Sequence, residues 1–354
     1  MRNWLFGAGV AAVLLTVSLL AQQAQQTPGA APPPSPAQSA APAHTEGGAL
    51  YQTSLHFTNA GLEYWYAKEH GGLERLTGLP FSQMPCSGCH VASCDTCHVT
   101  RTADGKLSYT TPRGKAEDAC AKCHDTDKEA QKLDVHAARG MLCMDCHAAS
   151  EIHGDGTRQL SMQHPGVMRT SCVGCHKTSC TGNAVHAGRV DCTACHVRDL
   201  PSCYNCHVET RIQGKKSVSI PLNGLLFLVN HDGKVTLASL HTFEYRGQGL
   251  VTFAPSFPHQ VMKQGRACDD CHATTAVRAA ADASFTPVHW QNGQLDAMRG
   301  VIPVVEGAAW NLPLLDRVDG KWVPITPKAP TLTNFAGFCT PLTRAQLARL
   351  AEKH

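Results

Sequence analysis

The chain has 354 residues, of which 18 are cysteine and 20 are histidine, whereas Trp, Tyr and Phe together contribute only 21. The net charge of +3 is too small and too dispersed for the basic footprint of a nucleic-acid-binding protein, so no nucleic-acid partner is expected. After residue 21 no apolar run is long enough to cross a bilayer, which excludes a multi-pass membrane protein, and the scarcity of aromatic residues requires another group to fill the interior.

The first 21 residues have the pattern of an export signal. Arg2 supplies the positive start, and the apolar stretch from residue 5 to residue 20 is shorter than a comfortable spanning helix. A cut after Ala21 predicts an exported protein in the periplasm or at the cell surface of a bacterium. Because no clean small-x-small triplet is present, an uncleaved anchor is the alternative, and it is the only membrane association expected. Residues 22–48, rich in Ala, Pro, Gln and Ser, are predicted to be a linker.

Helix signals are few. One helix is predicted over residues 59–69, ending at Gly71-Gly72, and a second over residues 126–135. A third is predicted near the C-terminus, with Thr340 as the N-cap and Pro341 at the first helical position.

Strand signals lie in the second half of the chain. A β-rich insertion is predicted at about residues 217–256, from apolar or alternating runs at 224–230, 235–241 and 250–253 and the hairpin signal Asp232-Gly233. In residues 273–354, expected to form a C-terminal cap, a second Asp-Gly turn at Asp319-Gly320 separates runs at 313–318 and 321–325.

Sixteen of the eighteen cysteines fall into one motif, C-x-x-C-H, which occurs eight times although roughly 0.05 occurrences are expected by chance. The cysteines are Cys86, Cys89, Cys94, Cys97, Cys120, Cys123, Cys143, Cys146, Cys172, Cys175, Cys192, Cys195, Cys203, Cys206, Cys268 and Cys271. The histidines that follow them are His90, His98, His124, His147, His176, His196, His207 and His272.

The spacing is typical of c-type haem attachment. Two thiols three positions apart can form thioethers to the two vinyl groups of one porphyrin, and the next histidine then ligates the iron. Zinc sites would leave the eight following histidines without explanation, a disulfide framework has no need of a fixed following histidine, and a thioredoxin-like motif would occur once. The cofactor predicted is therefore eight covalently attached haem c groups.

On these motifs, from Cys86 to His272, the chain resembles the octahaem members of the multihaem c-type cytochromes. The resemblance implies a mostly irregular chain with few short helices wrapped around a haem array over residues 49–272, plus the small β-rich insertion and the haem-free cap at 273–354. The five steps from Cys89 to Cys94 span at most about 18 Å, so the first two haems are expected to be close neighbours. The eight steps from Cys195 to Cys203, about 28 Å when fully extended, predict a second close pair.

Twelve further histidines are available as second axial ligands, and setting aside His44 and His354 leaves ten for eight irons. The candidates taken as ligands are His56, His70, His136, His153, His164, His186, His259 and His289. Four of them, His136, His164, His186 and His259, precede a motif at short range, a spacing that usually ligates a neighbouring haem in multihaem cytochromes. His231 and His241 stay open, as do His70 and His289, because a solvated or core histidine is the plain alternative for each.

Mainly bis-histidine irons predict an electron carrier or conduit, with a redox partner protein or an extracellular acceptor. Full loading changes the net charge of +3 to about −5 when oxidised, so a basic partner is plausible, and a filament or oligomer is compatible with this reading. The alternative is an oxidoreductase of the tetrathionate, nitrite or hydroxylamine type at one open iron, whose catalytic residues the sequence does not identify. The two remaining cysteines, Cys180 and Cys339, are predicted to form a disulfide, and two buried free thiols are the alternative.

Overall fold

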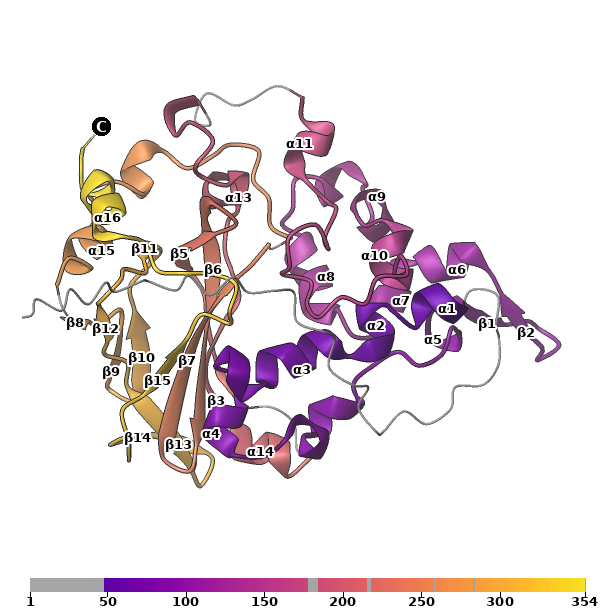
Figure 1. The fold of residues 1–354 in the computed structure, drawn as a ribbon, viewed down its shortest axis with the longest axis horizontal. Helices are drawn as coiled ribbons and strands as arrows, with labels where there is room; N and C mark the ends of the chain where they lie inside the picture. Colours follow the sequence, from indigo (N-terminus) through magenta and orange to yellow (C-terminus); the bar gives the residue numbers. More distant parts are fainter. Residues whose placement is uncertain (1–47, 178–183, 215–217, 258, 283, 354) are drawn as a thin grey trace, which may run out of the picture. The chain divides into compact units, whose positions relative to one another are not determined.

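The computed structural model describes residues 48–177, 184–214, 218–257, 259–282 and 284–353, and its largest feature is a seven-stranded mixed sheet (Figure 1). The chain divides into the units Met1–Ala41 and Pro42–His354, and every described residue lies in the second. The predicted export signal, the linker up to residue 47 and Cys180 lie outside the described residues.

The α-helices are mostly single turns. They are α1 Gly48–Tyr51, α2 Leu55–Thr58, α3 Ala60–Tyr66, α4 Glu74–Thr77, α5 Asp95–His98, α6 Thr111–Lys115, α7 Glu117–Cys120, α8 Asp125–Gln131, α9 Cys143–Cys146, α10 Ala149–His153, α11 Cys172–Cys175, α13 Cys192–His196, α14 Val208–Ile212, α15 Thr275–Ala279 and α16 Arg344–Leu350. Short 3-10 helices are η1 Lys68–His70, η2 Phe81–Gln83, η3 Pro85–Gly88, η4 Ala137–Arg139 and η5 Cys268–Asp270.

The strands belong to the seven-stranded sheet and to four two-stranded pairs in the described residues. They are β1 Val99–Arg101, β2 Leu107–Tyr109, β3 Ser202–His207, β4 Ile220–Leu222, β5 Leu225–His231, β6 Lys234–Tyr245, β7 Gln248–Pro255, β8 Ser284–Phe285, β9 Val288–Gln291, β10 Gln294–Ala297, β11 Gly300–Pro303, β12 Ala309–Trp310, β13 Leu314–Val318, β14 Lys321–Ile325 and β15 Leu332–Asn334.

The expectation of a mostly irregular chain with few short helices is wrong. The described residues form 15 helices and about 15 strands, amounting to 31% helix and 26% strand. Many of the helices begin in or beside a C-x-x-C-H motif, because the i, i+3 spacing of its cysteines is itself the spacing of one helical turn. Most of the motifs therefore lie in or beside short helices, and the seventh lies in strand β3.

Strand β6 organises the large sheet. Along one edge it pairs antiparallel with β7, and along the other it pairs antiparallel with β5 at its start and parallel with β3 at its end. Strands β11 and β15, from the C-terminal part of the chain, add parallel to β5 and β7. One sheet thus joins strands from both sides of the domain boundary expected after residue 272.

The two faces of this sheet bury different clusters, as the alternation along β6 requires. Leu240 and Phe227 point into a cluster with Trp310 and other residues of the C-terminal strands. Leu237 faces the other way and packs with Ala194 of α13, while Tyr245 packs with residues of α3 and α4. The helical part of the chain therefore packs on the face opposite to the C-terminal strands.

The predicted strands and turns are close to those observed. Asp232-Gly233 and Asp319-Gly320 both have positive φ, with values of 47° and 73° in the first and 49° and 76° in the second, and they join β5 to β6 and β13 to β14. The C-terminal helix begins later than predicted. Its N-cap is Thr343, whose hydroxyl accepts from the Gln346 amide, because Thr340 pairs in a bridge with Asn230.

No helix of the described residues is long and apolar enough to cross a membrane.

Asn205 connects the sheet to the C-terminal hairpin. It is fully buried with φ of 55°, its Oδ1 accepts from the Leu315 amide at 2.9 Å, and its Nδ2 donates to the Leu315 carbonyl. We expect Asn205→Ala to lower the free energy of unfolding by about 3 kcal/mol, since two buried backbone groups lose their partner and alanine is strained at positive φ. Urea denaturation measures the loss. Asn292→Ala, at an exposed position with φ of 51°, should cost about 1 kcal/mol or less, and equal losses would contradict this account.

Candidate functional site

Most C-x-x-C-H motifs lie on or beside short helical turns. The turns α5, α9, α11 and α13 and the 3-10 helices η3 and η5 each start at or near the first cysteine of a motif, and α7 ends at Cys120. Residues three apart on a helical turn share a face, so both thiols of such a motif point the same way. The two thiols are therefore placed to attach one planar ligand.

Local hydrogen bonds explain why these turns form. Ser171 and Asp191, each just before a motif, accept from the amides of Gly174 at 3.2 Å and Thr193 at 2.9 Å as helix N-caps. Inside two other motifs, an aspartate accepts from the backbone amide of the residue directly before the first cysteine: Asp145 accepts from Leu142 at 2.8 Å, and Asp270 accepts from Ala267 at 2.9 Å. The capping residues are encoded next to the cysteines.

The described residues contain five pairs in which the histidine of a motif faces a second histidine. The pairs, with the distances between ring centroids, are His56 and His124 at 6.3 Å, His98 and His153 at 5.9 Å, His136 and His176 at 6.0 Å, His147 and His259 at 6.0 Å, and His186 and His272 at 6.3 Å. Each pair joins one of the candidate second ligands to one motif.

This separation equals the space that one metal ion needs between two imidazoles. A metal–imidazole bond of about 2.05 Å, plus about 1.1 Å from a ring nitrogen to the centre of a ring with bonds of about 1.33 Å, gives about 6.3 Å for two rings. Tilted ring contacts have similar centroid distances, as Tyr51 and His153 do at 6.1 Å, so the five pairs are distinguished by joining a motif histidine to a second histidine. The five pairs therefore fit an iron with two axial histidines.

The outer nitrogens of several paired rings are held by acceptors, which leaves Nε2 facing the partner ring. Nδ1 of His98 lies 3.2 Å from the Thr110 carbonyl, and Nδ1 of His153 lies 3.1 Å from the Ala149 carbonyl. Metal-bound histidines almost always donate their other N–H to a carbonyl or a carboxylate in this way. A proton on Nδ1 of these rings would be satisfied by the carbonyl, which is the arrangement that ligation through Nε2 uses.

Carboxylates hold the outer nitrogens in three further pairs. A carboxylate oxygen lies close to Nδ1 in each: Glu151 is 2.8 Å from His147, Asp134 is 3.0 Å from His136, and Asp127 is 3.1 Å from His124. Sequence reasoning did not find these acidic residues. The available signal was the helical spacing, because Asp127 and Glu151 follow their histidines at i+3 and i+4.

Burial favours the neutral forms of His56 and of two motif cysteines. Burial lowers the pKa of His56, and the neighbouring His124 lowers it further, which favours the neutral imidazole. Burial also raises the pKa of the Cys172 and Cys271 thiols to about 11 each. Gly114 lies so close to His98 that a Cβ there would meet the ring, so the approach of the two depends on glycine.

Neighbouring motifs contact one another along the chain. Lys122, inside the third motif, donates from Nζ to the carbonyl of Thr96 inside the second. The thiols of Cys120 in the third motif and Cys143 in the fourth share a hydrogen bond. The second, third and fourth motifs are therefore in direct succession in space.

The succession continues towards the C-terminus. The Thr170 hydroxyl, two residues before the fifth motif, donates to the carbonyl of Cys146 in the fourth at 2.8 Å. The thiols of Cys172 in the fifth motif and Cys192 in the sixth share a hydrogen bond. The fourth, fifth and sixth motifs thus form a second run of contacts.

The seventh motif departs from sequence order. Arg266, just before the eighth motif, donates its backbone amide to the carbonyl of Cys195 in the sixth at 3.0 Å, so the sixth motif meets the eighth. Cys86 of the first motif packs on the same hydrophobic cluster as Phe243, which is the strand partner of Cys206 in the seventh. The first and second motifs are separated by three residues, so the contacts link the first six motifs in succession, with the eighth beside the sixth and the seventh near the first.

The seventh motif also has a different conformation. It lies in strand β3, where an irregularity puts Cys203 opposite His241 and Cys206 opposite Phe243, two positions apart on β6. Both cysteines therefore share one face of the sheet, whereas His207, opposite Glu244, lies on the other. In this conformation the motif does not present its thiols and its histidine to one ligand.

His207 instead approaches two carboxylates. Its Nε2 lies 3.1 Å from an oxygen of Asp316 and 3.4 Å from one of Glu244, and the three ligand atoms lie within 4.8 Å of one another. Glu244 is fully buried, and burial raises the pKa of its carboxyl group.

Two other motif histidines have no second imidazole among the described residues. His90 is exposed, and His196 turns its Nδ1 to the Met262 carbonyl at 3.1 Å. With His207, three of the eight motifs are therefore without a described partner ring.

Five of the ten candidate second ligands lie outside the ring pairs. His70 stacks on Tyr64, and His164 meets Tyr64 edge-on at 5.4 Å. The other three lie on strands: His231 holds the Phe338 carbonyl at 2.7 Å, His241 meets the Ser239 hydroxyl at 2.9 Å with its pKa lowered to about 4 by burial, and His289 is exposed on β9. The structure brings none of the five against a motif histidine.

Cys339 is buried, its Sγ donates to the carbonyls of Phe253 and Phe335 at 3.5 Å, and burial raises the pKa of its thiol to about 12. It has no disulfide partner among the described residues.

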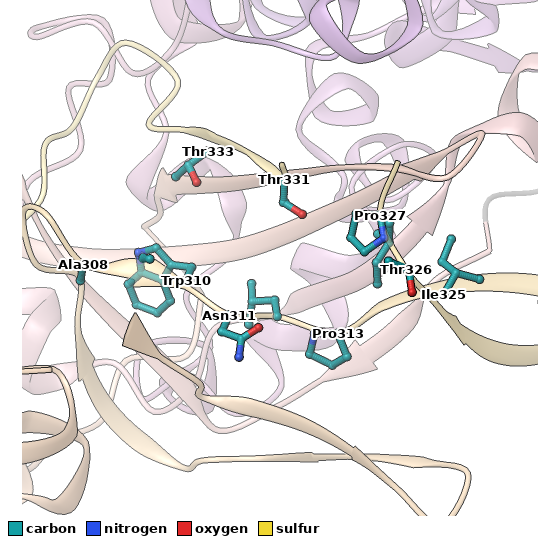
Figure 2. A pocket seen from close by; sticks show the side chains of 12 residues that line it. Ala308, Trp310, Asn311, Pro313, Ile325, Thr326, Pro327, Thr331 and Thr333 are labelled. Atoms are coloured by element: carbon teal, nitrogen blue, oxygen red, sulfur yellow. The ribbon is translucent and has the colours of Figure 1, made fainter. Parts of the chain in front are cut away.

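A cavity of about 520 Å³ lies between the C-terminal strands, with Trp310, Pro313 and Thr331 in its wall (Figure 2). Its lining contains neither cysteine nor histidine, so it is separate from the motifs.

No family model, curated protein sequence or solved structure matches this chain.

Proposed function

We propose that the protein is an octahaem c-type cytochrome that carries or conducts electrons outside the cytoplasm. The observation that carries the proposal is the set of five histidine pairs at 5.9–6.3 Å, each with one member in a C-x-x-C-H motif. The spacing of the cysteines extends the proposal to all eight motifs. Bound haem would supply one-electron chemistry, and the protein would supply attachment, orientation and exclusion of water.

The roles of the residues follow from their positions. The motif cysteines would attach the porphyrin and the motif histidines would hold the iron from one side; at the seventh motif this requires a conformation other than the strand described above. His56, His136, His153, His186 and His259 ligate from the other side, which closes these five irons to substrates. Backbone carbonyls and carboxylates at Nδ1 keep the rings oriented.

The contacts between successive motifs favour conduction over storage. The contacts between neighbouring motifs would bring each redox centre close to the next. The two ends of this succession are the places for exchange with a redox partner protein or an extracellular acceptor. Export to the periplasm or the cell surface is part of the proposal, since haem c is attached there; it rests on the signal-like residues 1–21.

Counting the haems tests the proposal. We expect eight covalent haems per chain when the exported protein is analysed by pyridine haemochrome absorbance together with intact mass. A colourless protein with free or zinc-bound thiols would overturn the proposal. A count of seven with unmodified Cys203 and Cys206 would confine it to the other motifs.

One observation favours a second function. The irons of the first, sixth and seventh motifs have no second imidazole among the described residues, and an iron with a free position can bind a substrate. An oxidoreductase acting on a small nitrogen or sulfur compound is therefore the second candidate. A high-spin electron paramagnetic resonance signal that changes on addition of nitrite, hydroxylamine or sulfite would favour it over a simple conduit.

A further inference from the structure

Asp127 lies between two of the histidine pairs. It is in the first turn of α8, which begins directly after the third motif. Its Oδ2 is 3.1 Å from Nδ1 of His124, and its Oδ1 is 3.5 Å from Nδ1 of His259. That His259 nitrogen is buried and has no hydrogen-bond partner among the described residues, and the Asp127 carboxylate faces it at ion-pair distance. One carboxylate thus faces the outer nitrogens of two histidines that are far apart in the sequence.

The two histidines belong to different metal positions. His124 is the motif histidine of the pair with His56, and His259 is the second histidine of the pair with His147. The third and fourth motifs also touch through Cys120 and Cys143. Asp127 therefore spans two neighbouring sites instead of supporting one.

A carboxylate at Nδ1 changes the metal as well as the ring. Accepting the Nδ1 proton makes the imidazole a more basic ligand, which favours ferric over ferrous iron and lowers the reduction potential. The groups near the Nδ1 atoms differ among the pairs. In the pair of His98 and His153, both Nδ1 atoms lie near backbone carbonyls. In the pair of His147 and His259, Nδ1 of His147 lies near the Glu151 carboxylate and Nδ1 of His259 lies near the Asp127 carboxylate.

We infer that Asp127 is a positioning residue shared by two irons, holding one axial histidine of the third-motif haem and one of the fourth-motif haem and lowering the reduction potential of both. The inference rests on the proposed haem attachment. It makes the fourth-motif iron, with carboxylates at both axial ligands, a more reducing point of the conduit than the second-motif iron, which has none.

The test is a redox titration of the haem-loaded full chain, followed by optical and electron paramagnetic resonance spectra. In Asp127→Asn we expect two of the haems to move to more positive potentials, each by about tenfold in the one-electron reduction equilibrium, which is 59 mV. The others should stay unchanged. Asp125→Asn is the matched control, because Asp125 lies on the same helix, is exposed, and hydrogen-bonds only Thr126.

Each outcome decides a different point. A shift of one haem alone would overturn the sharing, and no shift, or the same shift in Asp125→Asn, would overturn the role of Asp127. If Asp127→Asn fails to load its haems, Asp127→Glu is titrated instead and should perturb the same two irons. Failure of the haem proposal itself is distinguishable, because the unmodified protein would then carry no haem.

Discussion

Produced without attached haem, the chain should lose the structure of residues 85–177 and keep its large sheet. Among these 93 residues only Ala119, Asp134, Ser161 and Gln163 are buried, and three of the four are polar. A segment that buries so little apolar surface cannot offset the entropy of ordering its backbone. The sheet, in contrast, buries many large apolar side chains in its own clusters. The haems are therefore expected to be the core of the N-terminal half.

Hydrogen exchange with mass spectrometry measures this difference. The full chain made in the cytoplasm, where haem c is not attached, should exchange residues 85–177 within seconds while β5, β6 and β7 stay protected. The exported, haem-loaded chain is the control and should protect both regions. Equal protection of residues 85–177 in the two preparations would show that this half folds without haem.

Replacing His153 by alanine should open one iron and leave seven as they are. The ring of His153 faces His98 at 5.9 Å, and its Nδ1 lies 3.1 Å from the Ala149 carbonyl. Without the second imidazole the second-motif iron becomes five-coordinate, changes from low to high spin, and binds carbon monoxide when reduced. The expected change is one carbon monoxide per eight haems above the unmodified protein.

The control for this experiment is His289→Ala. His289 is exposed on β9 and lies outside the ring pairs, so its removal should leave the spectra and the carbon monoxide stoichiometry unchanged. An unchanged His153→Ala protein would mean that the ring pair does not mark an axial ligand set.

The sequence predicted the turns and the individual strands, which depend on interactions between neighbouring residues. The Asp-Gly turns and the strands around them appear where expected, because positive φ at adjacent positions and alternating burial are properties of a few consecutive residues. The large sheet could not be predicted, since β3 lies inside a motif and β11 and β15 come from the segment expected to be a separate cap. Their pairing depends on contacts between residues many tens of positions apart.

The same division holds for the site. The motif residues follow from spacing, and His56, His136, His153, His186 and His259 were among the candidate second ligands. Which motif each one faces could not be predicted, because His259 meets His147, more than 100 residues earlier, and only the tertiary fold brings them together. The carboxylates at Nδ1 are closer in sequence, but an acidic residue three or four positions from a histidine is too common to be singled out.

The position of β3 in the sheet bears on when haem could be attached to its two cysteines. Tyr204 and Asn205, between the two cysteines of this strand, are fully buried, and the partner strands β4 and β6 are both synthesised after it. Once they pair, a porphyrin can no longer approach this motif from the buried side. If haem is attached to Cys203 and Cys206 as proposed, attachment has to precede the pairing of these strands. Parallel pairing between distant segments closes slowly, so the topology itself lengthens the interval in which the enzymes of haem attachment can act.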